Sequence, residues 1–179
     1  MKKLSLKELN RLSVEDFKQS PKTPMVLVLD NIRSALNVGS AFRTADAFAL
    51  QKIYLCGITA QPPHREILKT AIGATDSVEW SYHSQTKEAV QLLRAEQYQI
   101  IAVEQAQESI QLAAFPVQAG GKYALVFGNE VNGVSQEVMD ILDHCIEIPQ
   151  YGTKHSLNVS VCLGIVVWDL FRKLNLSPH

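Results

Sequence analysis

The sequence has no closely spaced cysteines, although it contains three cysteines in all. Cys56, Cys145 and Cys162 lie far apart, and the C-x-x-C spacing of zinc and thioredoxin-like sites is absent. An odd number of cysteines without a disulfide pattern is typical of a reducing compartment. We therefore expect a cytoplasmic protein.

The sequence also lacks a secretion signal and a hydrophobic run long enough to cross a membrane. It begins Met-Lys-Lys, and no apolar segment follows these residues. The longest apolar stretch, residues 159–167, is too short to span a bilayer. No membrane partner is therefore expected.

Positive charge is not in excess. The sequence has 17 Lys and Arg against 18 Asp and Glu, which gives a net charge of −1 with the 5 histidines neutral. A protein that coats nucleic acid gains its affinity by neutralising phosphates, so this balance weighs against such a role. An enzyme with a local basic patch is still compatible with it. The histidines show no metal-binding spacing, and no metal site is predicted.

What the sequence does contain is a regular alternation of apolar runs and helical patterns. With 179 residues, 46% of them hydrophobic, the chain is expected to form one globular domain with a full core. The alternation predicts an α/β fold with a parallel sheet covered by helices on both faces. The expected strands are residues 25–29, 53–56, 77–82, 99–103, 123–127 and 145–148.

The first 22 residues differ from the rest because they lack this alternation. We expect residues 1–22 to form an N-terminal helical extension and residues 23–179 to form the domain. Ser13 is a plausible N-cap within the extension, because it precedes a short polar helical pattern.

The last predicted helix, residues 156–174, is apolar almost all round. A helix that covers one face of a sheet needs only one apolar stripe. Either this helix is buried at the centre of the domain, or its outer face is covered by another subunit. For a domain of this size we favour a homodimer, with Val166 or Val167 on the outer face.

Two segments near the C-terminus place polar side chains directly after apolar strands. Residues 127–135 include Asn129 and Glu130, and residues 148–160 include Ser156 and Asn158. Loops at the carboxyl ends of strands in open α/β sheets bind ligands. Each residue alone is compatible with an ordinary turn, but together they favour a small-molecule pocket.

Two familiar nucleotide-binding motifs are excluded. Gly128 and Gly133 have the spacing of a phosphate loop, but Val134 stands where that loop requires Lys. No G-x-G-x-x-G follows the first strand, so the dinucleotide fingerprint is absent as well.

The first helix of the domain carries an arginine among apolar residues. Asn37 is a natural N-cap for this helix, and Arg43 follows nearly two turns later. A single helical Arg is most often paired with a nearby acid such as Asp46. The alternative is a guanidinium that binds a phosphate or carboxylate near the strand ends.

Three motifs occur together in a characteristic order. They are Asn37-x-Gly39-x-x-x-Arg43, then Phe127-Gly128-Asn129-Glu130-x-x-Gly133, then Ile148-Pro149 with Ser156-Leu157-Asn158-Val159-Ser160. This set resembles the SpoU/TrmH family of RNA ribose 2′-O-methyltransferases, which belong to the SPOUT superfamily. The resemblance covers about residues 25–174.

The resemblance implies a fold, a cofactor and an assembly. The C-terminal third of the sheet would be threaded into a deep trefoil knot, a rare exception to the rule that chains are not knotted. The cofactor would be S-adenosylmethionine, and the substrate would be tRNA or rRNA. The protein would be a homodimer with its last helix in the interface.

The resemblance also implies roles for particular residues. The residues implied to bind the cofactor are Val103, Gly128, Asn129, Ile148, Pro149, Leu157 and Val159. The residues implied to act in catalysis are Asn37, Arg43, Glu130, Ser156 and Asn158. Arg43 would hold a phosphate beside the target ribose, and a role as the base would need an unusual environment because a free Arg is too basic.

The N-terminal segment is a second candidate for RNA binding. Many relatives carry a separate RNA-binding domain before the catalytic one, whereas about 22 residues precede the domain here. Lys3, Lys7 and Arg11 recur every four residues, so a helix would place them on one face. They would bind RNA together with Arg43, or they would form an ordinary solvated surface.

Two other functions are compatible with this fold. The first is a non-catalytic factor that binds or folds RNA, and the second is a methyltransferase that acts on a base. The joint presence of Asn37, Arg43, Glu130 and Asn158 favours an enzyme, and the Arg on the first helix favours ribose as its target.

Overall fold

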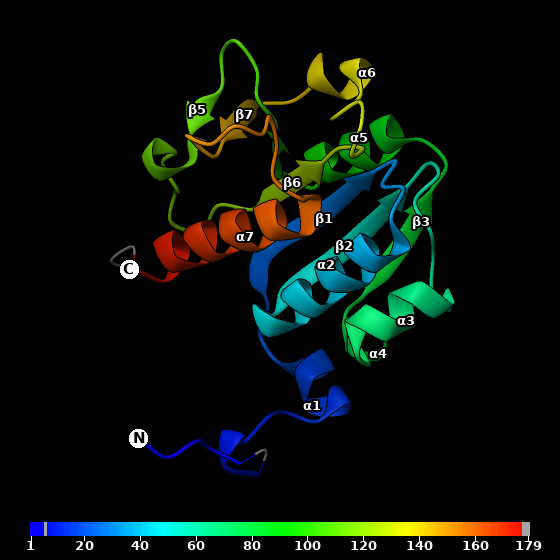
Figure 1. Ribbon diagram of the computed structural model, residues 1–179, viewed down its shortest axis with the longest axis vertical. Helices are drawn as coiled ribbons and strands as arrows, with labels where there is room; N and C mark the ends of the chain where they lie inside the picture. The colour runs from blue at the N-terminus through cyan, green and yellow to red at the C-terminus, as the bar shows by residue number, and fades with distance from the viewer. Residues whose placement is uncertain (6, 177–179) are drawn as a thin grey trace.

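A parallel sheet of seven strands forms the centre of the molecule. The computed structural model describes residues 1–5 and 7–176. The strand order is β3-β2-β1-β6-β4-β7-β5, and every neighbouring pair is parallel (Figure 1). The strands are β1 (Thr23–Asp30), β2 (Leu50–Cys56), β3 (Trp80–His83), β4 (Gln99–Val103), β5 (Ile110–Gln111), β6 (Tyr123–Phe127) and β7 (His144–Glu147).

Helices cover both faces of this sheet, as the sequence predicts. Helices α2 and α7 lie on one face, and α5 and α6 pack on the other (Figure 1). The helices are α1 (Val14–Gln19), α2 (Ala35–Ala47), α3 (Arg65–Ala71), α4 (Ala74–Ser77), α5 (Thr86–Ala95), α6 (Gln136–Met139) and α7 (Val159–Leu176), with 3₁₀ helices η1 (Lys7–Leu9) and η2 (Leu112–Ala114). None of the described helices combines the length and hydropathy that crossing a bilayer requires.

The continuous apolar sequence of β1 follows from its central position. Met25, Leu27 and Leu29 pack in the core beneath α2 and α7, whereas Val26 and Val28 pack in the core beneath α5. Successive side chains of a strand point to opposite faces, so a strand covered on both sides needs apolar residues throughout.

Helix α2 begins three residues before the position expected from the sequence. Its N-cap is Ser34, whose hydroxyl accepts a hydrogen bond from the Asn37 amide at 3.4 Å. The prediction that Asn37 caps this helix is therefore wrong. Gly39 allows α3 to pack closely, because a Cβ at this position would lie 2.1 Å from the Thr70 hydroxyl and 2.4 Å from the Ile67 carbonyl.

Several further boundaries differ from the prediction: β1 and β2 begin two and three residues earlier, and the two-residue strand β5 was not predicted. The third strand begins at Trp80, because residues up to Ser77 belong to α4. The last helix begins at Val159, which leaves Ser156 and Asn158 in the loop before it.

The outer face of α7 does not carry the residues predicted for it. Val166 and Val167 are fully buried in the core, so the prediction that one of them lies on the outer face is wrong. The exposed apolar side chains are those of Val161, Ile165 and Trp168, at 52%, 40% and 53% of their full accessibility. They follow the i, i+4, i+7 spacing of a single helix face.

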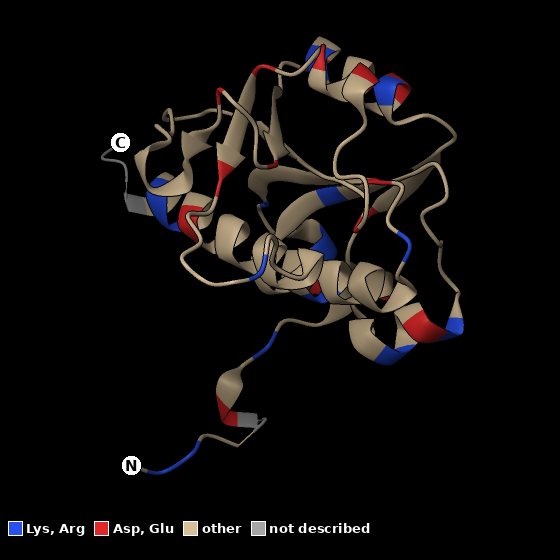
Figure 2. Ribbon diagram, turned by 45° about the horizontal axis from the view of Figure 1, so that its top comes forward, with Lys and Arg blue, Asp and Glu red and all other residues tan. Residues whose placement is uncertain are grey.

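The N-terminal segment projects away from the sheet (Figure 2). Ser13 caps α1 as expected, because its hydroxyl accepts a hydrogen bond from the Asp16 amide at 3.1 Å. Lys3 and Arg11, however, both lie outside helices, on either side of the three-residue helix η1. The prediction of one helix that carries Lys3, Lys7 and Arg11 is therefore wrong; the side chain of Lys7 lies outside the described part.

Candidate active site

A cavity of about 520 Å³ opens at the carboxyl ends of β4, β6 and β7, beside the first turn of α7. Two loops form most of its wall, residues 128–133 after β6 and residues 148–158 after β7. The residues singled out from the sequence that line it are Val103, Gly128, Asn129, Glu130, Ile148, Ser156, Leu157, Asn158 and Val159. Because the strands are parallel, their carboxyl ends bring these distant segments to one edge of the sheet.

The loop after β6 is folded back on itself around Asn129. The backbone of Asn129 pairs with that of Gly133, and the Asn129 side-chain oxygen accepts hydrogen bonds from the amides of Val131 and Asn132 at 2.9 and 3.2 Å. Its side-chain nitrogen donates to the Asn31 carbonyl at 2.7 Å. One side chain therefore shapes this loop and fastens it to the loop after β1.

Glycine is required at two positions of this turn. A Cβ on Gly128 would lie 2.1 Å from the backbone nitrogen of Val134, which cannot move aside without opening the loop. Gly133 has a φ of +68°, a conformation that L side chains rarely adopt. These glycines therefore set how tightly the wall of the cavity can turn.

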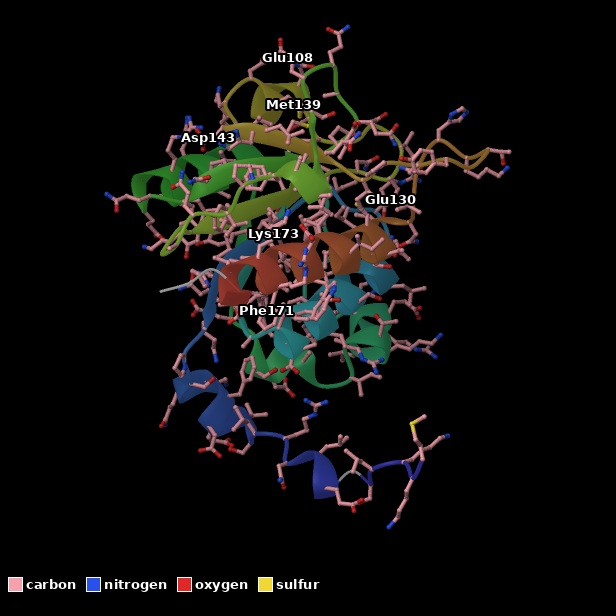
Figure 3. The ribbon with its side chains drawn as sticks, turned by 90° about the vertical axis from the view of Figure 1, so that its left-hand side faces the viewer. Glu108, Glu130, Met139, Asp143, Phe171 and Lys173 are labelled. Atoms are coloured by element: carbon pink, nitrogen blue, oxygen red, sulfur yellow. The ribbon has the colours of Figure 1, made fainter. Side chains whose placement is uncertain are left out.

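The carboxylate of Glu130 bridges the cavity loop and the start of α2. It accepts hydrogen bonds from the amides of Arg33 and Ser34 at 2.9 and 3.1 Å, and from the Asn37 side chain at 3.0 Å. Burial favours a higher pKa for the Glu130 carboxyl, but these hydrogen bonds outweigh burial and lower the pKa from its ordinary value. Figure 3 labels Glu130 near the first turn of α7.

The loop after β6 is also held at its far end by a buried carboxylate. Asp30, at the end of β1, is 1% exposed and accepts hydrogen bonds from the Ser135 amide at 2.9 Å and the Thr86 hydroxyl at 2.5 Å. It also accepts one from the Asn31 side chain at 2.8 Å. A buried charge is tolerated when donors satisfy it, so Asp30 fixes the far end of the turn.

The loop after β7 has fewer attachments. Residues 150–158 are exposed, and the Gln105 side chain donates a hydrogen bond to the His155 carbonyl at 2.7 Å. Asn158 starts α7, because its side-chain oxygen accepts a hydrogen bond from the Ser160 amide at 2.8 Å. The two walls therefore differ in how firmly they are held.

Three residues expected at the site do not line this cavity. Pro149 is exposed beside it, and Asn37 reaches it only through the hydrogen bond to Glu130. Arg43 lines a second, shallower depression of about 460 Å³. That depression lies between α2 and the residues around the end of α3, and it is lined by Ser40, Arg43, Thr44, Ala47, Phe48, Lys69, Thr70 and Ile72.

The cavity also contains functional candidates that the sequence reasoning missed. Glu104, Gln105 and Glu147 all line it, as does His155. Glu104 and Gln105 directly follow β4, and Glu147 is the last residue of β7. The rule that ligands bind at the carboxyl ends of parallel strands could have identified them.

The cavity combines apolar walls with backbone and side-chain polar groups, as small-molecule sites do. Its volume lies in the range of roughly 300–1,000 Å³ typical of ligand pockets. In the part of the chain that the structure describes, no group of three or more His, Cys, Asp or Glu could hold a metal ion.

Comparison with known proteins gives consistent matches. The sequence model of the SpoU rRNA Methylase family matches residues 24–168. A tRNA (guanosine(18)-2′-O)-methyltransferase of Aquifex aeolicus is 31% identical over 173 residues, which cover 93% of this chain and 77% of the relative. A 23S rRNA (guanosine-2′-O-)-methyltransferase of Vibrio parahaemolyticus is 27% identical over 168 residues, which cover 93% of this chain and 66% of the relative.

The fold is also similar to that of solved structures. The crystal structure of an AdoMet-bound rRNA methyltransferase from Sinorhizobium meliloti superposes with a TM-score of 0.79 at 25% identity. The match covers 88% of this chain and 60% of that one. This chain therefore spans about three fifths of the solved protein that carries the cofactor.

Proposed function

The chain belongs to the SpoU rRNA methylase family, and on this premise we propose that it transfers the methyl group of S-adenosylmethionine to a ribose 2′-hydroxyl of tRNA or rRNA. The observation that carries this proposal is the cavity, whose two walls are the loops that contain the family-like motifs. An RNA substrate would place the protein in the cytoplasm, as expected from its cysteines.

The cavity fits the proposed cofactor in size and in chemistry. Val103, Ile148 and Val159 offer apolar contacts for an adenine ring, and the turn at Gly128 exposes backbone groups to a ligand. Asn129 and Leu157 line the same space, and Pro149 stiffens the loop beside it. When bound, the cofactor supplies an activated methyl group on a sulfonium.

The polar residues bind the RNA substrate and hold the site in shape. Arg43 binds the phosphate beside the target ribose, because a guanidinium forms paired hydrogen bonds to phosphate oxygens and is too basic to act as a free base. Glu130 and Asn37 hold the start of α2 against the cavity loop. Ser156 and Asn158 shape the opposite wall at the start of α7. Holding two reactants in line contributes roughly 7–11 kcal/mol to lowering the barrier.

We propose that two protomers associate through the exposed face of α7. This face carries Val161, Ile165 and Trp168, and a contiguous exposed apolar patch marks an interaction site. The Trp168 ring lies 6.0 Å from that of Phe48, which lines the depression of Arg43. A partner on this face would therefore also approach the depression.

We also propose that the C-terminal part of residues 23–179 is threaded as a trefoil knot, with residues 1–22 as an extension. The family match begins at residue 24, which supports this boundary. In the sheet, β6 lies between β1 and β4, while β7 lies beyond β4. The Gln105 contact with His155 brings the segments after β4 and β7 together, as threading would require.

Mapping of 2′-O-methyl sites in total RNA, with and without the gene, tests the proposed function. Loss of a modified ribose in the deletion strain, restored by wild type but not by Arg43→Ala, is the expected result. A protein that binds RNA but neither S-adenosylmethionine nor any methyl group would instead be a non-catalytic RNA-binding factor. Methylation found on a base would redirect the proposal to base chemistry.

A further inference from the structure

The charged side chains that line the cavity are all acidic. Glu104, Glu130 and Glu147 contribute carboxylates, and no Lys or Arg occurs among the described residues of the lining. A low-dielectric cleft lined by charges of one sign concentrates their field. The cavity therefore favours a ligand that carries positive charge.

Glu104 is held at the cavity wall by the loop after β6. One of its carboxylate oxygens accepts a hydrogen bond from the Val134 amide at 3.2 Å, and the other accepts one from the Gln105 amide at 2.9 Å. A Cβ on Gly133 would lie 2.1 Å from the first oxygen, so glycine lets the loop close over this carboxylate. Glu104 thus holds its charge in a fixed place.

Glu147 differs because its side chain has no partner. The residue is half-buried at the end of β7, and its side chain makes no hydrogen bond or ion pair within residues 1–5 and 7–176. A cationic ligand in the cavity would give this carboxylate an ion-pair partner. Glu130, by contrast, is already occupied by three donors from the start of α2.

The negative charge of these carboxylates also affects two nearby cysteine thiols, Cys162 and Cys145. Burial raises the pKa of the Cys162 thiol to about 11, and the negative charge of Glu104 adds to this shift. Burial also raises the pKa of the Cys145 thiol; its hydrogen bond to the Glu104 carbonyl lowers the pKa, and the negative charges of Glu104 and Glu147 raise it further. Burial is the largest cause of both shifts, and the nearby carboxylates add to it.

We propose that Glu104 and Glu147 make the cavity select the positively charged methyl donor over its neutral product. This inference rests on the proposed function. S-adenosylmethionine carries a sulfonium, an ammonium and a carboxylate, which give a net charge of +1. Methyl transfer forms a C–O bond to the ribose and breaks the S–C bond, whose electron pair stays on sulfur, while the proton of the 2′-hydroxyl is released to solvent. S-adenosylhomocysteine therefore has no net charge. The carboxylates therefore retain the donor and release the product.

Calorimetric titration of both ligands into wild type, Glu104→Gln and Glu147→Gln tests the proposal. Because the ligands differ only in the methyl group and its charge, the ratio of their dissociation constants cancels any general damage to the cavity. We expect each variant to reduce the preference for the donor by about threefold or more, and the reduction to shrink at high salt. Sinefungin, which carries an amine at the methyl position, should behave like the donor.

Gln105→Ala is the matched control. It removes the hydrogen bond to the His155 carbonyl but no charge, so it should weaken donor and product by the same factor. Donor-to-product ratios equal to wild type in both Glu variants and in their double variant would overturn the inference while leaving the proposed function intact. Failure of wild type to bind either ligand would overturn both.

Discussion

The cavity at the strand ends and the depression on α2 have opposite charge. Glu104, Glu130 and Glu147 line the cavity, whereas Arg43 and Lys69 are the charged residues of the depression. A cationic cofactor and a polyanionic RNA require surfaces of opposite sign. The overall charge of −1 conceals this division, so net charge alone says little about whether a small domain can bind RNA.

The two regions also differ in how they are built. The cavity wall is fixed by buried or half-buried groups such as Asp30 and Glu104, which bind backbone amides of the loop after β6. Arg43 and Lys69 are exposed on helix surfaces, and their side chains make no hydrogen bond or ion pair in the described chain. A preformed cavity suits a small cofactor, whereas long, unpaired cationic side chains can adapt to an RNA backbone.

The sharpest way to separate the two regions is Arg43→Ala. If the depression serves only the substrate, methyl transfer should fall by on the order of 10²–10³-fold or more, as for loss of one charge-stabilising donor. The dissociation constant of S-adenosylmethionine should change by less than about threefold, because Arg43 does not line the cavity. Radiolabelled methyl transfer and calorimetry measure the two effects. Equal losses in both would show that the two regions are not independent.

Arg43→Lys is the matched control for this variant. It retains the charge but loses the planar fork that binds a phosphate through two hydrogen bonds. An activity between those of wild type and Arg43→Ala would assign Arg43 to phosphate binding, and full activity would leave only its charge as the requirement.

Ile165→Glu tests whether a second protomer binds the exposed face of α7. Wild type should sediment as a dimer at micromolar concentration, and this variant should sediment as a monomer because burying an unpaired carboxylate costs several kcal/mol. The monomer should remain folded, since the Ile165 side chain is 40% exposed and lies outside the core. Val166→Glu, on the buried face of the same helix, should unfold instead. A monomeric wild type would remove the dimer from the proposal.

The sequence predicted the central strands of the sheet well because they are buried on both faces, but it missed the two-residue strand β5, which has no apolar run. The bounds of β4 and β6 agree with the predicted strands, since continuous apolar runs between polar turns leave little freedom in their ends. The start of α2 was less certain, because Ser34 and Asn37 are both good caps and only packing chooses between them.

The acidic character of the cavity could not be predicted from the sequence. Glu104 and Glu147 are 43 positions apart, and they meet only because β4 and β7 are neighbours in the sheet. In the same way, the apolar sequence of α7 predicts burial but not which stripe faces the core. Val166 and Ile165 are adjacent, yet one is buried and the other exposed.

The smallest expected effect concerns the N-terminal segment. Replacement of Lys3, Lys7 and Arg11 with Ala tests whether the RNA-binding surface extends from the depression of Arg43 to the N-terminal segment. No single helix aligns these residues, so each would contact phosphates separately. RNA affinity should fall only several-fold, and its salt slope should decrease by about two to three units, near one for each lost phosphate contact.

RNA binding measured at several salt concentrations tests this prediction, with Lys87→Ala on α5 as a control on the opposite face of the sheet. S-adenosylmethionine affinity should be unchanged in both variants, because neither alters the cavity. If the triple variant matches wild type at every salt concentration, the segment makes no phosphate contact. RNA recognition would then rest on the domain itself, where Arg43 and Lys69 are the cations of the depression.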